Sequence, residues 1–374
     1  SRYCPNILSF CSLLSLNARG LSAIITIAKN FDEGELLRIM NSTNGIITVF
    51  AGSASRPFAQ KMCDYLGVEL GKSTTHIFSE GGIYVRADES IRNKDVYIVQ
   101  SIGKDPNNAF TELIFWIDAF KRASANSITA IIPYFGYAKA DKKDEPRVSI
   151  RARVCADCIE MCGADRVVTM DLHAAQVQGF FSKPVDHLYA SALLCEYARH
   201  LGIVNENLVV VSPDAGSAKR ARAYANILGC NVAIGDKVRI GHDENPNALE
   251  IIGDVKGKTC MVVDDFTISG NTLCKVAYGL MDKGAKEIYA FLSHAIVKED
   301  AVKRIEESPI KMLVTTDTVD NTDVLKNSKK IKVVSAAPLF AEAVRTIHER
   351  EPMAYMFEHL PARLMEMSFE DTDK

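Results

Sequence analysis

The chain has 374 residues, of which 47% are hydrophobic and 24% are charged, and its formal net charge is −3. This length predicts about two domains, and the composition is ordinary for a globular protein. The balanced charge argues against a general nucleic-acid-binding surface, and no apolar run approaches the roughly 18 residues of a membrane span. We therefore expect neither a nucleic-acid partner nor a membrane anchor.

The first 45 residues differ in composition from the rest of the chain. Residues 1–31 contain several serines and three basic residues but no acidic residue before residue 32. This composition is typical of an organellar transit peptide, and a plain N-terminal extension explains it equally well. The predicted compartment is accordingly the cytoplasm, or a plastid or mitochondrion if the segment is a transit peptide.

From about residue 46 onward, short β-rich runs alternate with amphipathic helical runs. This alternation is typical of an α/β fold in which helices cover mostly parallel sheets. Nine strands are predicted: Val96–Gln100, Ile128–Pro133, Val167–Asp171, Leu208–Ser212, Asn231–Gly235, Cys260–Asp264, Ile288–Leu292, Met312–Thr316 and Ile331–Val334.

A weak internal repeat indicates two related domains. Glu89–Ser101 resembles Gly253–Asp265, since each reads as a basic loop that leads into a buried strand. The predicted boundary lies between residues 190 and 191. We expect an N-terminal domain over 46–190, a C-terminal domain over 191–350 and a further segment over 351–374.

Polar and charged clusters follow five successive strands of this prediction. Because ligands of open parallel sheets bind beyond the carboxyl ends of the strands, we expect these clusters to form the functional site. They are the segments Tyr134–Asp144, Asp171–Gln176, Ser212–Ala221, Gly235–Arg239 and Asp264–Thr272.

The last of these clusters combines an acidic pair with a small-residue turn. Asp264 and Asp265 are predicted to end a buried strand, where carboxylates accept hydrogen bonds from neighbouring sugar hydroxyls. The turn leads into a helix predicted to start at Leu273, and its N–H groups and hydroxyls suit a phosphate. The turn residues are Ser269, Gly270, Asn271 and Thr272. A diol clamp beside a phosphate cradle fits ribose 5-phosphate, whereas a plain helix N-cap would leave the acidic pair unexplained.

Two other clusters suit a metal-bound nucleotide. Asp214 follows a strand and precedes Ala-Gly-Ser, which allows close approach of a pyrophosphate with Mg²⁺. Asp171 and His173 form an Asp-x-His pair at another strand end, although a histidine in such a place is more often structural.

Lys237 and Arg239 form a pair of cations two residues apart. On an extended strand both project from one face, where they suit a phosphoryl group that gains charge in its transition state. A solvated basic edge is the alternative. The sequence contains no GxxxxGK[ST] P-loop, so ATP would be held in another way.

Three cysteines are closely spaced in the sequence "VCADCIEMCG". Cys155, Cys158 and Cys162 could supply zinc ligands, but no second Cys pair or His pair accompanies them. Their spacing places them on one face of a helix, and a buried helix face is the preferred interpretation.

These segments resemble the ribose-phosphate pyrophosphokinase family, from about Phe50 to Leu360. Four motifs carry the resemblance: "IPYFGYAKADKKDEPR", "GADRVVTMDLHAAQVQGFF", "VSPDAGSAKRARA" and "VVDDFTISGNTL". The resemblance implies two tandem phosphoribosyltransferase-like domains, each with a mostly parallel sheet flanked by helices. It implies transfer of the pyrophosphoryl group of ATP, with Mg²⁺, to the anomeric hydroxyl of ribose 5-phosphate. A homo-oligomer, or a hetero-oligomer with paralogues, is also implied.

The resemblance further implies a role for each site residue. Lys237 and Arg239 would be catalytic, and Asp171, His173 and Asp214 would hold the metal. The ATP-binding residues would be Phe78, Lys139, Asp141 and His173. The residues that bind ribose 5-phosphate would be Asp264, Asp265, Ser269, Gly270, Asn271 and Thr272.

The chain departs from the family pattern at four binding positions. Ile268 stands in place of an Asp, Lys139 in place of an Arg and Gly82 in place of a Glu. Asn271 replaces a glycine at a position predicted to allow unusual φ angles. These departures leave a catalytically weak regulatory or partner subunit as the alternative to an active enzyme. A phosphoribosyltransferase is a third possibility, but proteins of that class share only the "VVDD" segment with this chain and not its "SPDAGSAKR" and "DLHAAQ" motifs.

Overall fold

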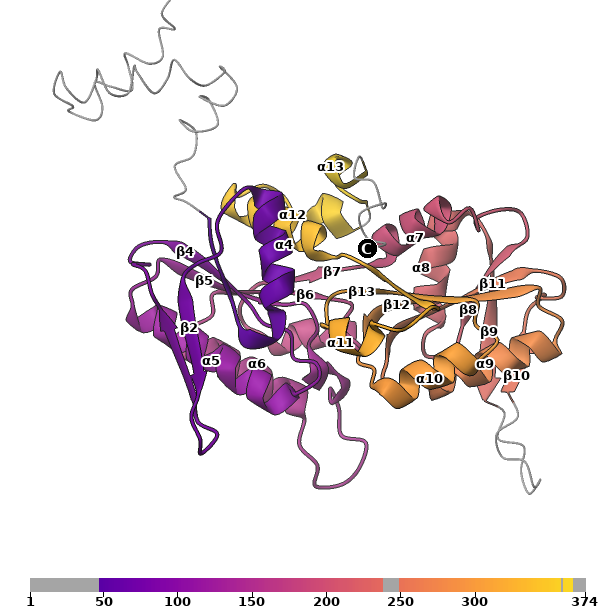
Figure 1. Ribbon diagram of the computed structural model, residues 1–374, viewed down its shortest axis with the longest axis horizontal. Coiled ribbons are helices and arrows are strands. Elements are labelled where there is room, and N and C mark those ends of the chain that lie inside the picture. Colours follow the sequence, from indigo (N-terminus) through magenta and orange to yellow (C-terminus); the bar gives the residue numbers. More distant parts are fainter. Residues whose placement is uncertain (1–46, 238–248, 358, 366–374) are drawn as a thin grey trace, which may run out of the picture. The chain divides into compact units, whose positions relative to one another are not determined.

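The computed structural model describes residues 47–237, 249–357 and 359–365 (Figure 1). By its contacts, the chain from Ile46 onward forms one compact unit. The predicted N-terminal extension and Arg239 lie outside the described residues, as does the side chain of Lys237. In the described part, no helix combines the length and the hydropathy that crossing a membrane requires.

The first sheet has five parallel strands in the order β1-β4-β5-β6-β7. Their bounds are β1 Thr48–Ala51, β4 Asp95–Val99, β5 Ser127–Ile132, β6 Arg166–Met170 and β7 Val185–Leu188. β4 and β5 are mostly buried and largely apolar, because helices cover both faces of the sheet. The helices of this half are α4 Arg56–Leu66, α5 Pro106–Arg122 and α6 Arg151–Cys162.

The second sheet has seven strands in the order β10-β9-β8-β11-β12-β13-β14, and only the β10–β9 pair is antiparallel. Their bounds are β8 Leu208–Ser212, β9 Asn231–Lys237, β10 Leu249–Ile252, β11 Thr259–Thr267, β12 Glu287–Ala295, β13 Met312–Thr316 and β14 Ile331–Val334. The helices are α7 Ser191–His200, α8 Ala218–Leu228, α9 Asn271–Asp282, α10 Glu299–Glu307, α11 Thr322–Leu325, α12 Ala337–His348 and α13 Ala362–Met365.

All nine predicted strands are confirmed, and so is the α/β class with two mostly parallel sheets. The hairpin of β2 (Ser73–Ile77) and β3 (Ile83–Ala87) was not predicted, because β2 is mostly polar and the apolar run of β3 is only three residues long. The four-residue strands β1, β7 and β10 were not predicted either.

Of three hydrophobic cores among the described residues, one spans both halves. This core includes Val49 and Met62 from the first half and Val210 and Phe291 from the second. Helix α12 packs against α4, where the Phe58 and Phe340 rings lie 5.4 Å apart at 78°. The domain boundary between residues 190 and 191 stays a prediction.

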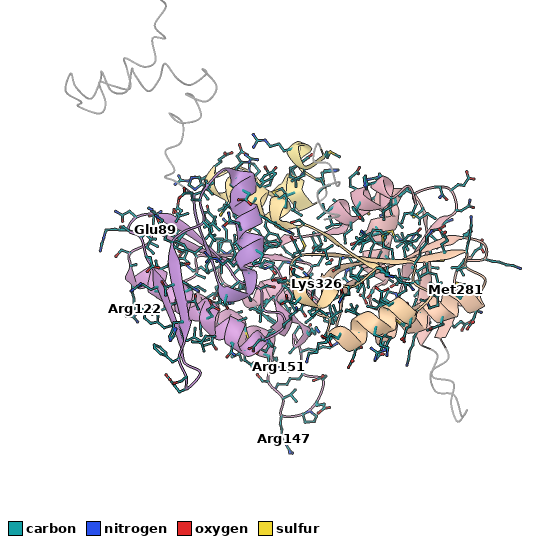
Figure 2. All side chains as sticks on the ribbon, in the orientation of Figure 1. Glu89, Arg122, Arg147, Arg151, Met281 and Lys326 are labelled. Atoms are coloured by element: carbon teal, nitrogen blue, oxygen red, sulfur yellow. The ribbon has the colours of Figure 1, made fainter. Side chains whose placement is uncertain are left out.

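The three cysteines lie on helix α6, whose predicted buried face is only partly buried. Cys155 is buried in the core, and Cys158 and Cys162 are half-buried. No group of three or more His, Cys, Asp or Glu side chains that could hold a metal ion occurs among the described residues. The loop before α6 carries exposed charged residues, and Figure 2 shows Arg147 at its outer end.

Candidate functional site

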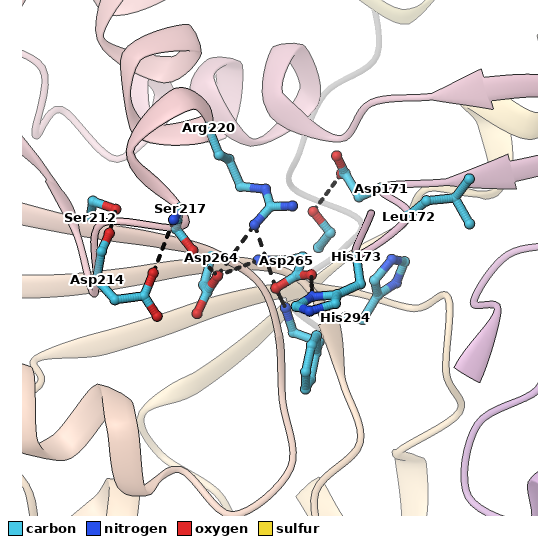
Figure 3. A network of polar contacts seen from close by, with 12 residues as sticks. Asp171, Leu172, His173, Ser212, Asp214, Ser217, Arg220, Asp264, Asp265 and His294 are labelled. Carbon is cyan, nitrogen blue, oxygen red and sulfur yellow. Dashed lines mark hydrogen bonds and ion pairs between the residues drawn. The ribbon is translucent and has the colours of Figure 1, made fainter. Parts of the chain in front are cut away.

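Residues from strand β11 of one sheet and from the segment after strand β6 of the other come together at the candidate site (Figure 3). His173 follows β6 of the first sheet, and its Nδ1 lies 2.7 Å from Oδ2 of Asp265 in β11 of the second sheet. The His173 side chain is 47% exposed, whereas that of Asp265 is 4% exposed. The site therefore joins two strand ends that the sequence predicted separately.

The acidic pair lies inside β11, so the prediction that Asp264 and Asp265 end their strand is wrong. Pairing with β8 stops at Val262, while pairing with β12 continues to Thr267. The two carboxylates thus lie beyond the end of β8, where the loop to α8 leaves room beside β11. They still occupy the edge of the sheet at which ligands are expected.

Arg220, in the first turn of α8, lies between the two carboxylates. Its NH1 is 3.3 Å from Oδ1 of Asp264 and 3.4 Å from Oδ1 of Asp265, and its side chain is 20% exposed. Arg220 was not among the predicted site residues. The available signal was its place in "SPDAGSAKRA", at the start of a helix that follows a polar strand end.

The environment shifts the two carboxylates in opposite directions. Burial, and then the neighbouring Asp265 carboxylate, raise the pKa of Asp264 to about 7. Burial also acts to raise the pKa of Asp265, but the His173 hydrogen bond and Arg220 outweigh it and lower that pKa overall. The hydrogen bond with Asp265 correspondingly raises the pKa of His173. The pair therefore combines a firmly ionised carboxylate with one that titrates easily.

Asp171 is held by contacts within the protein. Its side chain is buried and its Oδ2 accepts hydrogen bonds from the Ala190 N–H, at 2.9 Å, and from the Ser293 hydroxyl. Its φ is +38°, an uncommon value for a residue other than glycine. Asp171 therefore shapes the turn that presents His173 and connects that turn to β12.

Asp214 lies in the loop between β8 and α8. Its Oδ1 accepts a hydrogen bond from the Ser217 N–H at 2.9 Å, and its backbone carbonyl accepts one from the Ser212 hydroxyl at 2.6 Å. Oδ2 has no partner among the described residues. The Ser217 hydroxyl in turn donates to Asp264 at 3.0 Å, which connects this loop to the acidic pair.

The small-residue turn precedes α9, which starts at Asn271 rather than at the predicted Leu273. Gly270 has a φ of +72°, and a Cβ there would lie 3.2 Å from Ile305, so this position requires glycine. Asn271 is helical, so the prediction that it fills a φ-permissive position is wrong. Ser269, Asn271 and Thr272 are exposed, as is Ile268 at 49%.

The remaining predicted residues lie around this centre. Lys139 ends a short 3₁₀ helix after β5, and its Nζ lies 3.5 Å from the centroid of the Phe266 ring. Asp141 accepts a hydrogen bond from Gln176 at 3.2 Å. Phe78 is 45% exposed at the tip of the β2–β3 hairpin, and its ring contacts are with His76 and Tyr84 of that hairpin.

Comparisons with known proteins agree with this architecture. Residues 47–163 match the model of the N-terminal domain of ribose phosphate pyrophosphokinase, and residues 238–358 match the phosphoribosyl synthetase-associated domain. A ribose-phosphate pyrophosphokinase of Clostridium tetani (strain Massachusetts / E88) is 44% identical over 316 residues, which are 83% of this chain and 97% of that protein. One of Caldanaerobacter subterraneus subsp. tengcongensis is 45% identical over 313 residues, 83% of this chain and 98% of that protein.

A solved structure gives the same result. The crystal structure of phosphoribosylpyrophosphate synthetase from Mycobacterium smegmatis is similar with a TM-score of 0.77 and 37% identity, over 82% of this chain and 100% of that chain. The predicted fold of two tandem phosphoribosyltransferase-like domains is confirmed. The chain belongs to the ribose-phosphate pyrophosphokinase family.

Proposed function

We propose that the chain transfers the pyrophosphoryl group of ATP to the anomeric hydroxyl of ribose 5-phosphate, giving 5-phosphoribosyl 1-diphosphate and AMP. The observation that carries the proposal is the 2.7 Å contact between His173 and Asp265. It brings the strand end with the candidate nucleotide residues next to the strand end with the candidate sugar residues. Proximity of two bound substrates is the first requirement of such a transfer.

On the sugar side, Asp264 and Asp265 accept hydrogen bonds from the ribose hydroxyls. The 5-phosphate lies against residues 269–272, where the first N–H groups of α9 and its dipole favour an anion. Ser269 and Thr272 add hydroxyl donors, and both are exposed. Arg220 limits the repulsion between the two carboxylates while the sugar is absent.

The donor set fits Mg²⁺. This ion keeps several waters and is held by one or two protein groups together with substrate phosphates, so it needs no cage of protein ligands. Asp214 offers a carboxylate oxygen without a partner among the described residues. His173 would contribute Nε2 of its half-exposed ring in the neutral form, because its Nδ1 is held by Asp265. Asp171 contributes to this site by shaping the turn that presents His173. When bound, the metal neutralises charge on the transferred phosphates.

On the nucleotide side, Lys139 and Asp141 lie along the loop after β5, where they suit the phosphates and sugar of ATP. Phe78 offers an aromatic face for adenine from an exposed hairpin. Because this hairpin forms a two-stranded sheet of its own and its tip projects away from the rest of the fold (Figure 1), we propose that the adenine site is completed in an oligomer. Light scattering at micromolar concentration tests this, and a monomer would contradict it.

The catalytic proposal is tested by AMP release from Mg-ATP that depends on ribose 5-phosphate. Lys237 and Arg239 stabilise charge in the transition state, so Lys237→Ala should lower kcat by about 10²–10³-fold while both KM values change much less. Arg239→Ala should have a similar effect, and the double variant should be far from additive. Lys303→Ala, at an exposed position of α10 outside these clusters, is the control.

Two results would contradict the proposal in different ways. Good turnover that survives Lys237→Ala would show that the catalytic pair is misassigned. Absence of AMP release from the wild type, combined with stimulation of an active paralogue, would favour the regulatory subunit.

A further inference from the structure

A second contact joins the two halves beside the acidic pair. The Lys139 ammonium lies over the face of the Phe266 ring, with Nζ 3.5 Å from the ring centroid. The His173 ring packs against the same phenyl ring, with centroids 5.6 Å apart at 70°. Phe266 belongs to β11 and directly follows Asp265. One ring on the sugar-binding strand therefore contacts two residues assigned to the nucleotide side.

The contact has the geometry of a cation–π interaction. The negative face of an aromatic ring attracts an ammonium within about 6 Å of its centroid. Lys139 and Phe266 are both half-buried, so water screens this attraction less than at an exposed site. Burial lowers the pKa of Lys139, and the charge of Asp265 acts in the opposite direction. The ring and Asp265 together thus favour a charged ammonium in a place that otherwise disfavours it.

We propose that Phe266 is a positioning residue that holds the Lys139 ammonium for the phosphates of ATP. A lysine is a flexible point charge, without the rigid fork of the arginine that the family pattern has here. The phenyl ring restricts this flexibility and leaves the remaining N–H donors of Lys139 available to an anion. Because Phe266 is next to Asp265, the position of Lys139 depends on the sugar-binding strand. The role towards ATP rests on the proposed function, whereas the role towards Lys139 does not.

The contact itself is tested without catalysis. Wild type, Phe266→Leu and Phe266→Tyr are treated with an amine-reactive reagent, and the labelling rate of each lysine is measured by mass spectrometry. Leucine fills space without a π face, whereas tyrosine keeps the ring. Labelling of Lys139 should rise by about 3- to 10-fold in Phe266→Leu and remain near the wild-type rate in Phe266→Tyr. Lys303, exposed on α10, is the internal reference.

The role towards ATP is tested by binding and by kinetics. Phe266→Leu should raise the calorimetric Kd and the KM for ATP by about 3- to 10-fold, with a much smaller change in kcat. In a Lys139→Met background the same substitution should have little further effect, because the ring then has no cation to hold. Phe266→Met repeats the test if the leucine variant does not fold.

Each outcome supports or overturns a defined part of the proposal. Equal labelling of Lys139 in wild type and Phe266→Leu overturns the positioning role. Equal losses of ATP affinity with and without the Lys139→Met substitution overturn it as well, since they show that Phe266 acts independently of the lysine. If ATP does not protect wild-type Lys139 from labelling, the proposed function is wrong about Lys139, while the labelling of Phe266→Leu still decides the contact.

Discussion

The acidic pair and the small-residue turn are only a few residues apart, yet they differ in how their polar groups are satisfied. Asp264 and Asp265 are held by Arg220 and by His173 of the other sheet before any ligand binds. The turn over 269–272 is mostly exposed, and its hydrogen bonds are short-range apart from one between Arg304 and the Ser269 carbonyl. Buried charges require partners in the free protein, whereas exposed donors can remain solvated until the ligand binds. We call Asp264, Asp265, Arg220 and His173 the acidic network. Substitutions in this network should affect folding and catalysis together, whereas substitutions in the exposed segments should affect binding alone.

The largest expected effect comes from Arg220→Met. It leaves two buried carboxylates without their shared cation, and breaking such a pair typically costs about 3–5 kcal/mol. We expect a loss of this order in the free energy of unfolding, measured by urea denaturation, and at least about a 10²-fold loss of kcat/KM. Arg222→Met, at an exposed position of the same helix, is the control. An Arg220→Met protein with wild-type stability would show that the network does not need its cation.

The buried His294 should make the stability of the protein depend on pH. Its Nε2 donates to the Met170 carbonyl at 3.1 Å and its Nδ1 lies 2.7 Å from the Thr318 hydroxyl, so the neutral ring connects the two sheets. Burial lowers the pKa of His294 to about 4. The unfolded chain therefore binds a proton more readily than the folded protein. This contribution to stability is complete above about pH 6.5 and is lost as the pH falls towards 4, by about 3 kcal/mol in total.

The corresponding measurement is urea denaturation between pH 7 and pH 4. His294→Gln should be less stable at pH 7 and should lose less stability than the wild type over this interval. Parallel pH profiles of the two proteins would contradict the assignment of this pH dependence to His294.

Phe78→Ala tests an exposed segment. Loss of an aromatic face typically costs about 1–3 kcal/mol of stacking with a base, so the KM for ATP should rise by roughly 10-fold. The thermal midpoint should stay unchanged because Phe78 is at the exposed tip of a hairpin. Ile77→Ala, at a neighbouring exposed position, is the control. A shift in the thermal midpoint without a change in the KM for ATP would show that Phe78 supports folding and not ATP binding.

Ile268→Asp should have the smallest effect. An aliphatic side chain cannot accept a hydrogen bond from a sugar hydroxyl or from a metal-bound water, and at this exposed position a carboxylate has no burial cost. We expect the KM for ribose 5-phosphate to fall by a few-fold, on the order of 1 kcal/mol, with unchanged stability. Ile268→Asn separates the effect of charge from that of polarity. Unchanged kinetics in both variants would indicate that Thr267 already supplies the acceptor.

The sequence predicted the elements better than the contacts between them. The nine predicted strands were found because β-rich apolar runs are recognisable locally. Gly270 was likewise placed correctly in the turn after β11. The β2–β3 hairpin was missed because β2 is mostly polar and exposed, and the apolar run of β3 is only three residues long. The family resemblance implied that Asp171 is a metal ligand. Its burial against Ala190 and Ser293 depends on residues far from it in sequence.

The sequence alone therefore determined the succession of the predicted strands along the chain, the polar clusters that accompany them and the family of the chain, because each depends on neighbouring residues. The tertiary structure alone decided that His173 meets Asp265 across 92 residues, that Arg220 lies between the two carboxylates and that Phe266 contacts Lys139. These contacts arise where the strand ends of the two sheets meet. No periodicity within either segment specifies which side chains that packing brings together.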